Sequence, residues 1–492
     1  MKEMNIDELA LQCEKEALHH SGAIQPFGAL LRLDTDDNLI THASENLPSI
    51  AGIESSQMLE QSIDSYDWLR EGLSRLSDKY GKPFFWERAV KLRDWLDVAM
   101  IRTENGVLVE IERNELPDVH YDIQYYRQQL IKPIRESNEL EAYHQMILEV
   151  LNVVTGLSRI MVYRFHPDWS GEVIAELAAS GLGSYMGLRY PASDIPAIAR
   201  NLYLLNPIRS IPDIKAQPIP IIGLGDQPVD LSRTDLRSVS PMHIQYLENM
   251  GVAASLSLPI KLNGQLWGLI AGHHHAPLKL SRYQRHLCIE LVASYNLGLT
   301  NYFNGNRLKT LDNLERKAKQ LLNKIFVSGN PLDNIDDNQR EIMAFFQADG
   351  FAAIFDQDVI SVGSTPDMND MAAIDAWFGR QTDEVVSYEK LCDIFPDYPL
   401  LLAIVSGMLA IKIDLGRRGN FRFFWFRKEE KQEIPWAGNP NKPILEKADA
   451  IVLSPRRSFE KWVEVRSGYS LPWTDQDKLL ATKFRKIMLH WL

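Results

Sequence analysis

The feature that most restricts the fold of this chain is a helical pattern that runs from about residue 281 to residue 325. Its apolar positions recur at helical spacing, and many charged residues flank them. Only Gly298 and Gly305 weaken the pattern. A run far longer than an average globular helix is typical of a connecting rod or a coiled coil. A simple amphipathic surface helix is the alternative, and the length favours the rod.

Composition sets the class of protein and excludes several kinds of partner. The chain has 492 residues, which is room for roughly three domains. Its net charge of −12 argues against nucleic acid and acidic membrane surfaces as partners. No apolar run reaches the roughly 20 residues that span a bilayer, and no export signal opens the sequence. We therefore expect a cytoplasmic protein with no nucleic-acid or membrane partner.

Cysteine usage and local patterns suggest how the chain is divided. Cys13, Cys288 and Cys392 are too few and too scattered for a disulfide framework, so each is expected to be a free thiol. Residues 1–25 form an irregular arm, and residues 26–125 a compact unit of strands and loops. A helix over about 136–154 and a strand over 159–165 follow, and after the long helical run a third unit begins at about residue 333 and ends in a helix from 474.

The segment from Arg189 to Arg209 reads RYPASDIPAIARNLYLLNPIR and predicts a rigid turn with polar groups. Pro191 and Pro196 bracket Asp194 and restrict its backbone. A buried loop carboxylate beside a fixed carbonyl can bind a ring of N–H donors. Helical spacing would place Tyr203 and Arg209 downstream, as a hydroxyl and an anion-binding fork. A proline-rich turn that begins a helix is the alternative, and this segment alone does not separate the two.

Two further segments complete a family pattern. The run SPMHIQYL at 240–247 contains His243 and is followed by an alternating run at 254–260, and GQLWGLIAGHHH occupies 264–275. In this order and spacing, the three segments resemble the chromophore-binding GAF domain of phytochromes, the bilin-based red-light receptors. The rest of the chain is similar to the bacterial branch of that family.

The resemblance implies an α+β fold in which antiparallel sheets are joined by long helices. The implied order is a PAS domain at 26–125, a GAF domain at 135–305, and a PHY domain at 306–492. It also implies that the N-terminal arm is knotted through the GAF domain, which general topology rules would not suggest.

The pigment and its attachment follow from two positions. Cys13 lies in a polar arm upstream of Ile24-Gln25-Pro26, and the charges around it leave its reactivity open. By resemblance, bacterial phytochromes attach biliverdin through such a cysteine. Plant and cyanobacterial members use a cysteine directly before the GAF histidine, where this chain has Met242. The resemblance therefore implies biliverdin IXα, bound by a thioether to Cys13.

The resemblance also assigns roles inside the pocket. The Asp194 carbonyl and His243 would face the pyrrole nitrogens, although a lone histidine is more often an ordinary core residue. Arginine forks suit the two propionates, and alternate residues of a strand share a face. Phenol rings would line ring D, and His273 would bind its carbonyl. The predicted chromophore contacts are Cys13, Tyr163, Tyr190, Asp194, Ile195, Pro196, Tyr203, Arg209, Arg237, His243, Tyr246, Ser255, Ser257 and His273.

The run His273-His274-His275 has a metal site as its alternative reading. Successive side chains of a strand point to opposite faces, so at most His273 and His275 could converge on one ion. No cysteine or carboxylate follows at ligand spacing. We therefore expect no metal site.

An aromatic-rich excursion from about 421 to 464 is too long for a simple turn and is typical of a functional lid. Its segments, including FFWFRKE at 423–429, resemble the tongue of the PHY domain, although Ala437 stands where glycine is usual. The resemblance implies that Arg456 pairs with Asp194 in the dark and that Ser458 replaces it after illumination, as the tongue refolds. The predicted relay residues are Trp436, Arg456, Ser458, Trp462 and Glu464.

Together these features predict a red/far-red photoreceptor that switches between Pr and Pfr states by isomerisation at ring D. The resemblance implies a parallel homodimer that relays the change to an output domain or a response regulator. About twenty residues follow Trp473, too few for a kinase or cyclase domain, so we expect a sensor rather than an enzyme. The alternative is a GAF module regulated by a cyclic nucleotide, which predicts no role for Cys13 and no visible absorbance.

Overall fold

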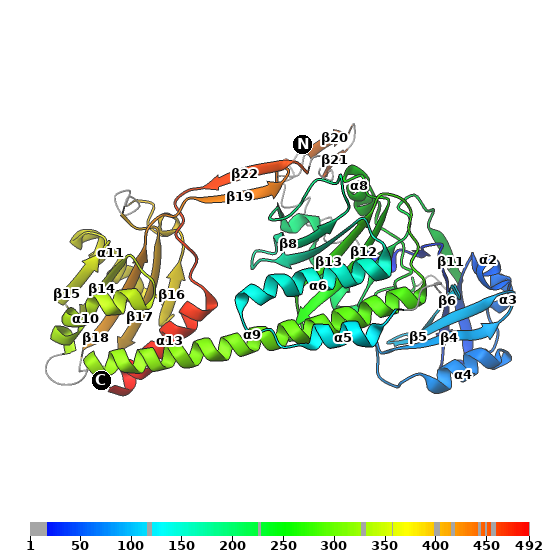
Figure 1. The fold of residues 1–492 in the computed structure, drawn as a ribbon, viewed down its shortest axis with the longest axis horizontal. Coiled ribbons are helices and arrows are strands. Elements are labelled where there is room, and N and C mark those ends of the chain that lie inside the picture. The colour runs from blue at the N-terminus through cyan, green and yellow to red at the C-terminus, as the bar shows by residue number, and fades with distance from the viewer. Residues whose placement is uncertain are drawn as a thin grey trace. The chain divides into compact units, whose positions relative to one another are not determined.

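The structure is a computed structural model that describes residues 17–115, 121–224, 228–325, 331–356, 358–397, 404–414, 419–440, 444–447, 450–453 and 459–491. The chain forms two compact units, one of residues 1–302 with 435–462, and one of residues 303–434 with 463–492. Helix α9, Arg282–Ile325, begins in the first unit and ends in the second (Figure 1). The long helix predicted over 281–325 is therefore confirmed, as is the α+β class with antiparallel sheets.

The first unit contains a seven-stranded antiparallel sheet in the order β1-β11-β3-β2-β6-β5-β4. The helices α2 (Leu47–Ala51), α3 (Ser55–Met58) and α4 (Asp67–Arg75) contribute to the core on one face. Its strands are β1 (Ala23–Ile24), β2 (Ala29–Asp34), β3 (Leu39–Ser44), β4 (Pro83–Lys91), β5 (Trp95–Thr103), β6 (Gly106–Arg113) and β11 (Ile219–Gly223).

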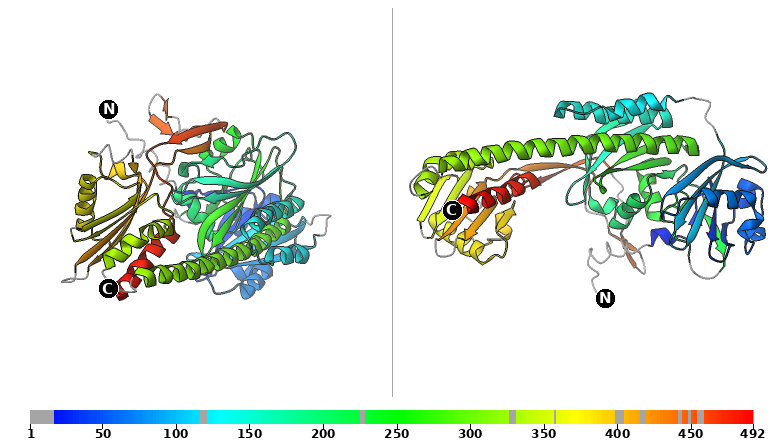
Figure 2. Two further views of the ribbon diagram at one scale, coloured as in Figure 1. Left: turned by 60° about the vertical axis from the view of Figure 1, so that its left-hand side comes forward. Right: turned by 90° about the horizontal axis from the view of Figure 1, so that it is seen from below.

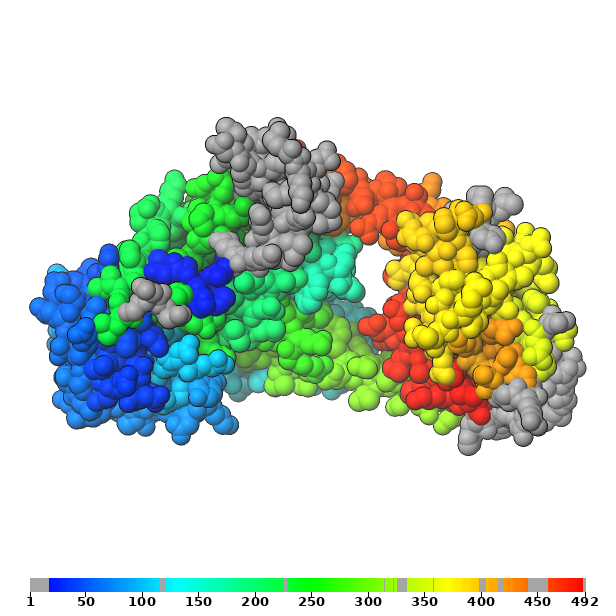
Figure 3. Space-filling view, turned by 180° about the vertical axis from the view of Figure 1, so that it is seen from behind, coloured from blue at the N-terminus to red at the C-terminus, as the bar shows by residue number. Residues whose placement is uncertain are grey.

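Strand β11 comes from a distant part of the chain and joins this sheet between β1 and β3. Ile24 is fully buried in a cluster that includes Leu231 and Leu236, from the segment after β11. The short helix η1, Leu18–His20, precedes this contact. In the space-filling view, the dark blue residues near the N-terminus lie directly against green residues (Figure 3). Residues 23–27 and the segment around 219–236 thus pack into one structure.

The second sheet has eight strands in the order β10-β12-β13-β7-β8-β9-β19-β22. The helices α5 (Ile123–Ile131), α6 (Ser137–Thr155) and the first part of α9 run side by side (Figure 2). The strands are β7 (Arg159–Phe165), β8 (Gly171–Ala178), β9 (Arg189–Tyr190), β10 (Arg209–Ile211), β12 (Ala254–Leu262), β13 (Gln265–His274), β19 (Gln432–Ala437) and β22 (Lys461–Arg466).

Helices α6 and α9 approach each other closely. The rings of Tyr143 and Tyr295 stack with centroids 5.0 Å apart, and Tyr143 Oη donates to the Leu130 carbonyl at 2.6 Å. A Cβ at Gly298 would lie 2.1 Å from Tyr143 Oη, so only glycine fits at this crossing. Gly298, which looked like a weak point in the helical pattern, is therefore a packing site. The predicted helix over 136–154 and the strand over 159–165 are confirmed.

The second unit is built on a five-stranded antiparallel sheet in the order β15-β14-β18-β17-β16. Helices α10 (Pro331–Phe345) and α13 (Asp475–Trp491) pack on one face, and α11 (Met368–Arg380) packs on the other. The helix predicted from 474 is thus confirmed. The strands are β14 (Gly350–Phe355), β15 (Asp358–Gly363), β16 (Val385–Tyr388), β17 (Gly407–Asp414) and β18 (Asn420–Arg427).

One prediction about the tongue is wrong. Residues 421–427 form most of β18, the central strand of this sheet, and Phe423, Phe424 and Trp425 are fully buried. Helices cover both faces of the sheet, so the strand is apolar on both sides and does not show the alternation of a surface strand. The excursion begins only after Arg427, with β19 and a two-stranded ribbon of β20 (Ile444–Lys447) and β21 (Ala450–Leu453).

Among the helices of the described residues, none has both the length and the apolar content to cross a membrane.

Candidate functional site

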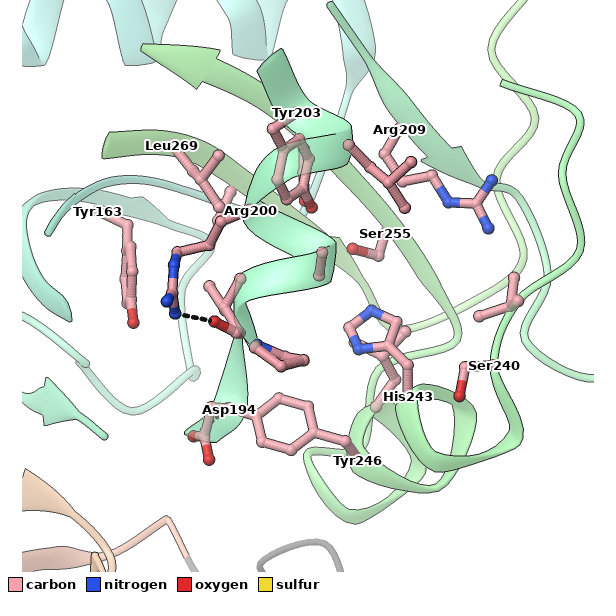
Figure 4. A pocket seen from close by; sticks show the side chains of 18 of the residues that line it. Tyr163, Asp194, Arg200, Tyr203, Arg209, Ser240, His243, Tyr246, Ser255 and Leu269 are labelled. Atoms are coloured by element: carbon pink, nitrogen blue, oxygen red, sulfur yellow. Dashed lines mark hydrogen bonds between the residues drawn. The ribbon is translucent and has the colours of Figure 1, made fainter. Parts of the chain in front are cut away.

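A cavity of about 540 Å³ opens in the first unit among α7 (Ala197–Leu205), α8 (Pro241–Asn249) and the strands β7, β12 and β13 (Figure 4). Ligand pockets usually have volumes of about 300–1,000 Å³. Cys13 lies outside the described residues. The cavity is lined by all the other predicted contacts, Tyr163, Tyr190, Asp194, Ile195, Pro196, Tyr203, Arg209, Arg237, His243, Tyr246, Ser255, Ser257 and His273.

The turn around Asp194 forms one wall of the cavity. Asp194 ends a short 3-10 helix at 192–194, and Pro196 caps the N-terminus of α7. The Asp194 carboxylate accepts a hydrogen bond from Tyr246 Oη at 3.1 Å, and Arg200 Nη1 donates to the Ile195 carbonyl at 2.6 Å. These bonds hold the turn against α8 and against the first turns of α7.

Two expectations about this segment are corrected. Asp194 is half-buried rather than buried, because its carboxylate lies at the edge of the cavity (Figure 4). Arg209 does not continue the helical spacing of Tyr203, because α7 ends at Leu205 and Arg209 begins β10. The residue before a proline disfavours the helical conformation, so the Asn206-Pro207 pair stops the helix.

Two histidines supply neutral polar groups. The His243 ring points into the cavity, and the surface that it exposes faces that cavity (Figure 4). Burial, together with the nearby Arg209 charge, lowers the pKa of His243 to about 4. Burial, with Arg159 and His243, lowers the pKa of His273 to about 3. Both rings are therefore neutral near pH 7, and each can donate one hydrogen bond and accept one.

One end of the cavity is cationic. Arg209 donates to the carbonyls of Asp235, Arg237 and Ser238 at 3.0, 2.7 and 3.0 Å. Arg237 is only 9% exposed, and among the described residues its Nη1 has no hydrogen-bond partner. Burial, and then the nearby Arg209 charge, lower the pKa of Arg237 to about 9, so it remains charged at pH 7. A buried cation with an unused N–H group is suited to an anion.

Hydroxyl groups also face the cavity. The Tyr203 hydroxyl is hydrogen-bonded to Ser257, and burial raises the pKa of Tyr203, so the phenol stays protonated. Ser255 and Ser257 both face the cavity from β12, as alternate residues of a strand do. This row places neutral donors beside the two arginines.

Aromatic rings form the third side. The ring centroids of Tyr163 and Tyr190 are 5.8 Å apart, and those of Tyr190 and Tyr185 are 6.5 Å apart. A Cβ at Gly171 would lie 1.8 Å from the Tyr163 ring, so this glycine leaves room for the phenol. The lining here is apolar, with a few phenol oxygens.

The segment after residue 434 contacts this part of the first unit. Trp436 pairs with Arg189 of β9, and the Arg189 guanidinium lies 5.6 Å from the Trp436 ring centroid. Arg189 also forms an ion pair with Asp168 at 3.2 Å. The Phe459 ring packs edge-on against Tyr246, with centroids 5.2 Å apart.

Comparison with known proteins identifies this arrangement. Three family models match the chain, a PAS fold at residues 13–114, a GAF domain at 139–295, and the Phytochrome region at 314–492. Cyanobacterial phytochrome B of Nostoc sp. is 33% identical over 99% of this chain and 67% of its own length. The bacteriophytochrome of Xanthomonas campestris is 30% identical over 94% of this chain and 75% of its own length.

The chain belongs to the phytochrome family. Solved structures agree: a bacteriophytochrome from the photosynthetic bacterium R. palustris superposes with a TM-score of 0.82 at 28% identity, over 98% of this chain and 99% of that one. The photosensory core module of Stigmatella aurantiaca phytochrome gives 0.81 at 28% identity, over 97% of each chain. This phytochrome chain is thus a photosensory module, and it spans about two thirds of the length of the Nostoc relatives.

The predicted relay residues of this phytochrome differ in burial and contacts, and two of them lie outside the described residues. Trp436 is buried at the contact with Arg189, whereas Trp462 is 40% exposed. Glu464 accepts a hydrogen bond from Arg466 at 3.1 Å. Arg456 and Ser458 lie outside the described residues, so their predicted exchange at Asp194 stays a prediction.

Sequence reasoning missed several lining residues of the phytochrome pocket. Arg200 follows Pro196 by one helical turn, and this spacing could have predicted that both residues face the same side of α7. Leu18 lines the cavity although it precedes the GAF motifs by more than a hundred residues, and no local pattern indicates this. The described residues hold no group of three metal-ligating side chains, and His274 Nδ1 accepts a hydrogen bond from Ser158 N at 3.1 Å.

Proposed function

We propose that this phytochrome binds biliverdin IXα in the cavity and acts as a red/far-red photoreceptor that switches between Pr and Pfr states at ring D. The observation that carries the proposal is that one cavity combines the buried Arg237, whose Nη1 has no hydrogen-bond partner within the described part of the chain, with a neutral polar wall. A linear tetrapyrrole has two carboxylates and several N–H donors, which need these two environments. When bound, the bilin supplies the absorption of red light and a double bond that isomerises.

The residues then have separate tasks. Arg209 and Arg237 hold the carboxylates, with Tyr203, Ser255 and Ser257 donating hydroxyl hydrogen bonds, because charge-assisted bonds are the strongest in such a site. The Asp194 carbonyl and His243 accept the pyrrole N–H groups. Tyr163, Tyr190 and Tyr246 enclose ring D loosely, and His273 binds its carbonyl. Ile195 and Pro196 complete the wall beside Asp194.

Cys13 is the proposed anchor of the thioether. Leu18 lines the cavity, and five residues of extended chain span at most about 17 Å. Cys13 is therefore within reach of a cavity ligand. Of the other thiols, Cys288 is buried and burial raises its pKa to about 12, so it does not compete as a nucleophile.

The remaining proposals concern signalling. We infer that the segment after residue 434, with Trp436, Arg456, Ser458, Trp462 and Glu464, relays the change to an output domain or response regulator in the cytoplasm. We also infer a parallel homodimer, because α5, α6 and α9 expose the apolar residues Ile131, Val153, Leu297 and Leu308. Light scattering of the purified chain tests the dimer, and a monomer at micromolar concentration would contradict it.

The central experiment is to purify the chain with and without biliverdin and to record absorbance before and after red light. The proposal expects a red band that shifts reversibly. A sample without a red band, or without a light-driven change, would contradict it. Cys13→Ser should release pigment under denaturing conditions, whereas the matched Cys392→Ser should retain it.

A further test addresses the proposed proton-coupled residues. Asp194→Ala and His243→Ala should each leave pigment binding largely intact and impair photoconversion. Unchanged photoconversion in both variants would show that the assigned roles are wrong.

A further inference from the structure

A group of five buried charged residues lies beside the cavity and is not part of its lining. Glu110 and Glu112 project from β6, Arg282 and Arg285 from the first turn of α9, and Asp235 from the segment between β11 and α8. The exposed fraction of each is between 1% and 7%. Buried charges are costly unless they are paired, so removing one partner leaves an uncompensated charge.

The five residues form a continuous chain of ion pairs. Arg282 Nη2 lies 3.1 Å from Glu110 Oε2 and 2.5 Å from Glu112 Oε1. Arg285 Nη2 also lies 2.5 Å from Glu112 Oε1, and Arg285 Nε lies 3.2 Å from Asp235 Oδ2. Asp235 is therefore one end of this series of ion pairs.

Asp235 is bonded to the anion-binding end of the cavity in two ways. Its carboxylate accepts a hydrogen bond from the backbone N–H of Ser210, directly after Arg209, at 2.7 Å. Its carbonyl accepts hydrogen bonds from Arg209 Nη1 at 3.0 Å and from Gln25 Nε2 at 3.1 Å. Arg237 follows two residues later. The position of Asp235 thus fixes Arg209 directly, and Arg237 belongs to the same segment.

The hydrogen bonds of Arg209 show how the segment 235–238 orients its guanidinium. A guanidinium has five N–H donors, and three hydrogen bonds of Arg209 go to carbonyls of the segment 235–238. Those three bonds set the plane of the fork, and with it the direction of its remaining donors. A displaced segment would rotate the fork away from an anion in the cavity.

We propose that Asp235 is a positioning residue that couples carboxylate binding in the cavity to the first turn of α9, through its ion pair with Arg285. The inference rests on the proposed function, because it takes the two carboxylates of a bilin as the anion. Burial raises the pKa of Asp235 to about 6 although Arg285 and Arg209 oppose the shift, which agrees with a carboxylate that depends on its partners.

The test compares biliverdin, a dicarboxylate, with its neutral dimethyl ester. Both are titrated into the whole chain in a Cys13→Ser background, in which binding is reversible. The parent should prefer the dicarboxylate by about 10-fold or more, the value of one charge-assisted hydrogen bond. Asp235→Asn removes the charge and keeps an oxygen for the Ser210 N–H. It should lower that preference about 10-fold and leave affinity for the ester unchanged.

The matched control is Glu110→Gln, which removes a carboxylate from the same group but does not touch the segment 235–238. It should retain the preference for the dicarboxylate. Hydrogen exchange should slow in residues 282–290 when the dicarboxylate binds to the parent and to Glu110→Gln, and should not slow in Asp235→Asn. Arg285→Lys, which keeps the charge but loses the fork, is a second variant with the same expected direction as Asp235→Asn.

Two results would overturn the inference. One is an unchanged preference in Asp235→Asn and Arg285→Lys. The other is an equal loss in Glu110→Gln, which would show a general effect of stability. If the parent and Asp235→Asn prefer the dicarboxylate equally, only this inference is contradicted. If the parent binds neither compound, the proposed function and the inference are contradicted together.

Discussion

The contact between α6 and α9 makes a quantitative prediction about acid sensitivity. His144 of α6 is 4% exposed, and its Nδ1 is hydrogen-bonded to the Tyr295 hydroxyl of α9. Burial, and then the charge of Arg164, lower the pKa of His144 to about 4. Burial raises the pKa of Tyr295, so its hydroxyl keeps a proton that it can donate. His144 is therefore held neutral in the folded unit.

Stability falls as the pH falls, because the folded and unfolded states differ in the pKa of His144. The pKa of His144 is about 6.5 when the chain is unfolded and about 4 when it is folded, so the unfolded state takes up the proton first. The stability that depends on neutral His144 is complete above pH 6.5 and is lost between pH 6.5 and pH 4. At about 1.4 kcal/mol per pH unit, the loss at pH 5 is about 2 kcal/mol.

The perturbation is His144→Gln, which keeps an acceptor for Tyr295 but does not titrate. Hydrogen exchange of the most protected amides in α6 and β7 gives the opening free energy at pH 7.5 and pH 5. The wild type should lose about 2 kcal/mol more than the variant between these conditions, because every other titrating group is shared. Tyr295→Phe, which leaves His144 titratable, should keep a steep dependence on pH. Equal losses in wild type and His144→Gln would refute the reasoning.

Three further predictions concern packing and charge. Gly298→Ala places a methyl group against Tyr143 and should lower the stability of the first unit by about 1–3 kcal/mol. The same hydrogen-exchange experiment measures this loss. An unchanged stability would contradict the close approach of α6 and α9. Arg285→Met leaves the buried carboxylates of Glu112 and Asp235 without this cation and should lower the free energy of unfolding by about 3–5 kcal/mol at pH 7.5. The loss should be smaller at pH 5.5, where the carboxylates take up protons. A loss that does not depend on pH would contradict this prediction. Arg189→Gln removes the cation beside Trp436 and should speed proteolysis after residue 434, whereas equal cleavage would show that this contact contributes nothing.

Local patterns in the sequence predicted the helices well. The helical spacing over 136–154, 281–325 and 474–492 corresponds to α6, α9 and α13, because each of these helices has one buried and one exposed side. The same reasoning failed at 421–427, where a strand covered on both faces gives a continuous aromatic run. An aromatic run of that kind does not distinguish a core strand from a functional excursion.

The predicted site residues were chosen on a different basis, from sequence motifs. The motifs around Asp194 and His243 identified a set of residues, and the structure places the described ones around one cavity. What no motif indicated were contacts between residues far apart in sequence. The bonds from Arg209 to carbonyls of 235–238, and the ion pair of Asp235 with Arg285, depend on the folded path of the chain and leave no periodic signal.

The placement of β11 in the first sheet has a consequence for synthesis on the ribosome. Strands β1 and β3 leave the ribosome roughly 200 residues before their shared partner, which at about 5–20 residues per second is about 10–40 s. During that interval the edge of β3 has no neighbour, and an open strand edge invites pairing with other chains. The N-terminal domain of this phytochrome is therefore an incomplete nascent domain, and slow translation or a shortage of chaperones should reduce its yield before any pigment is encountered.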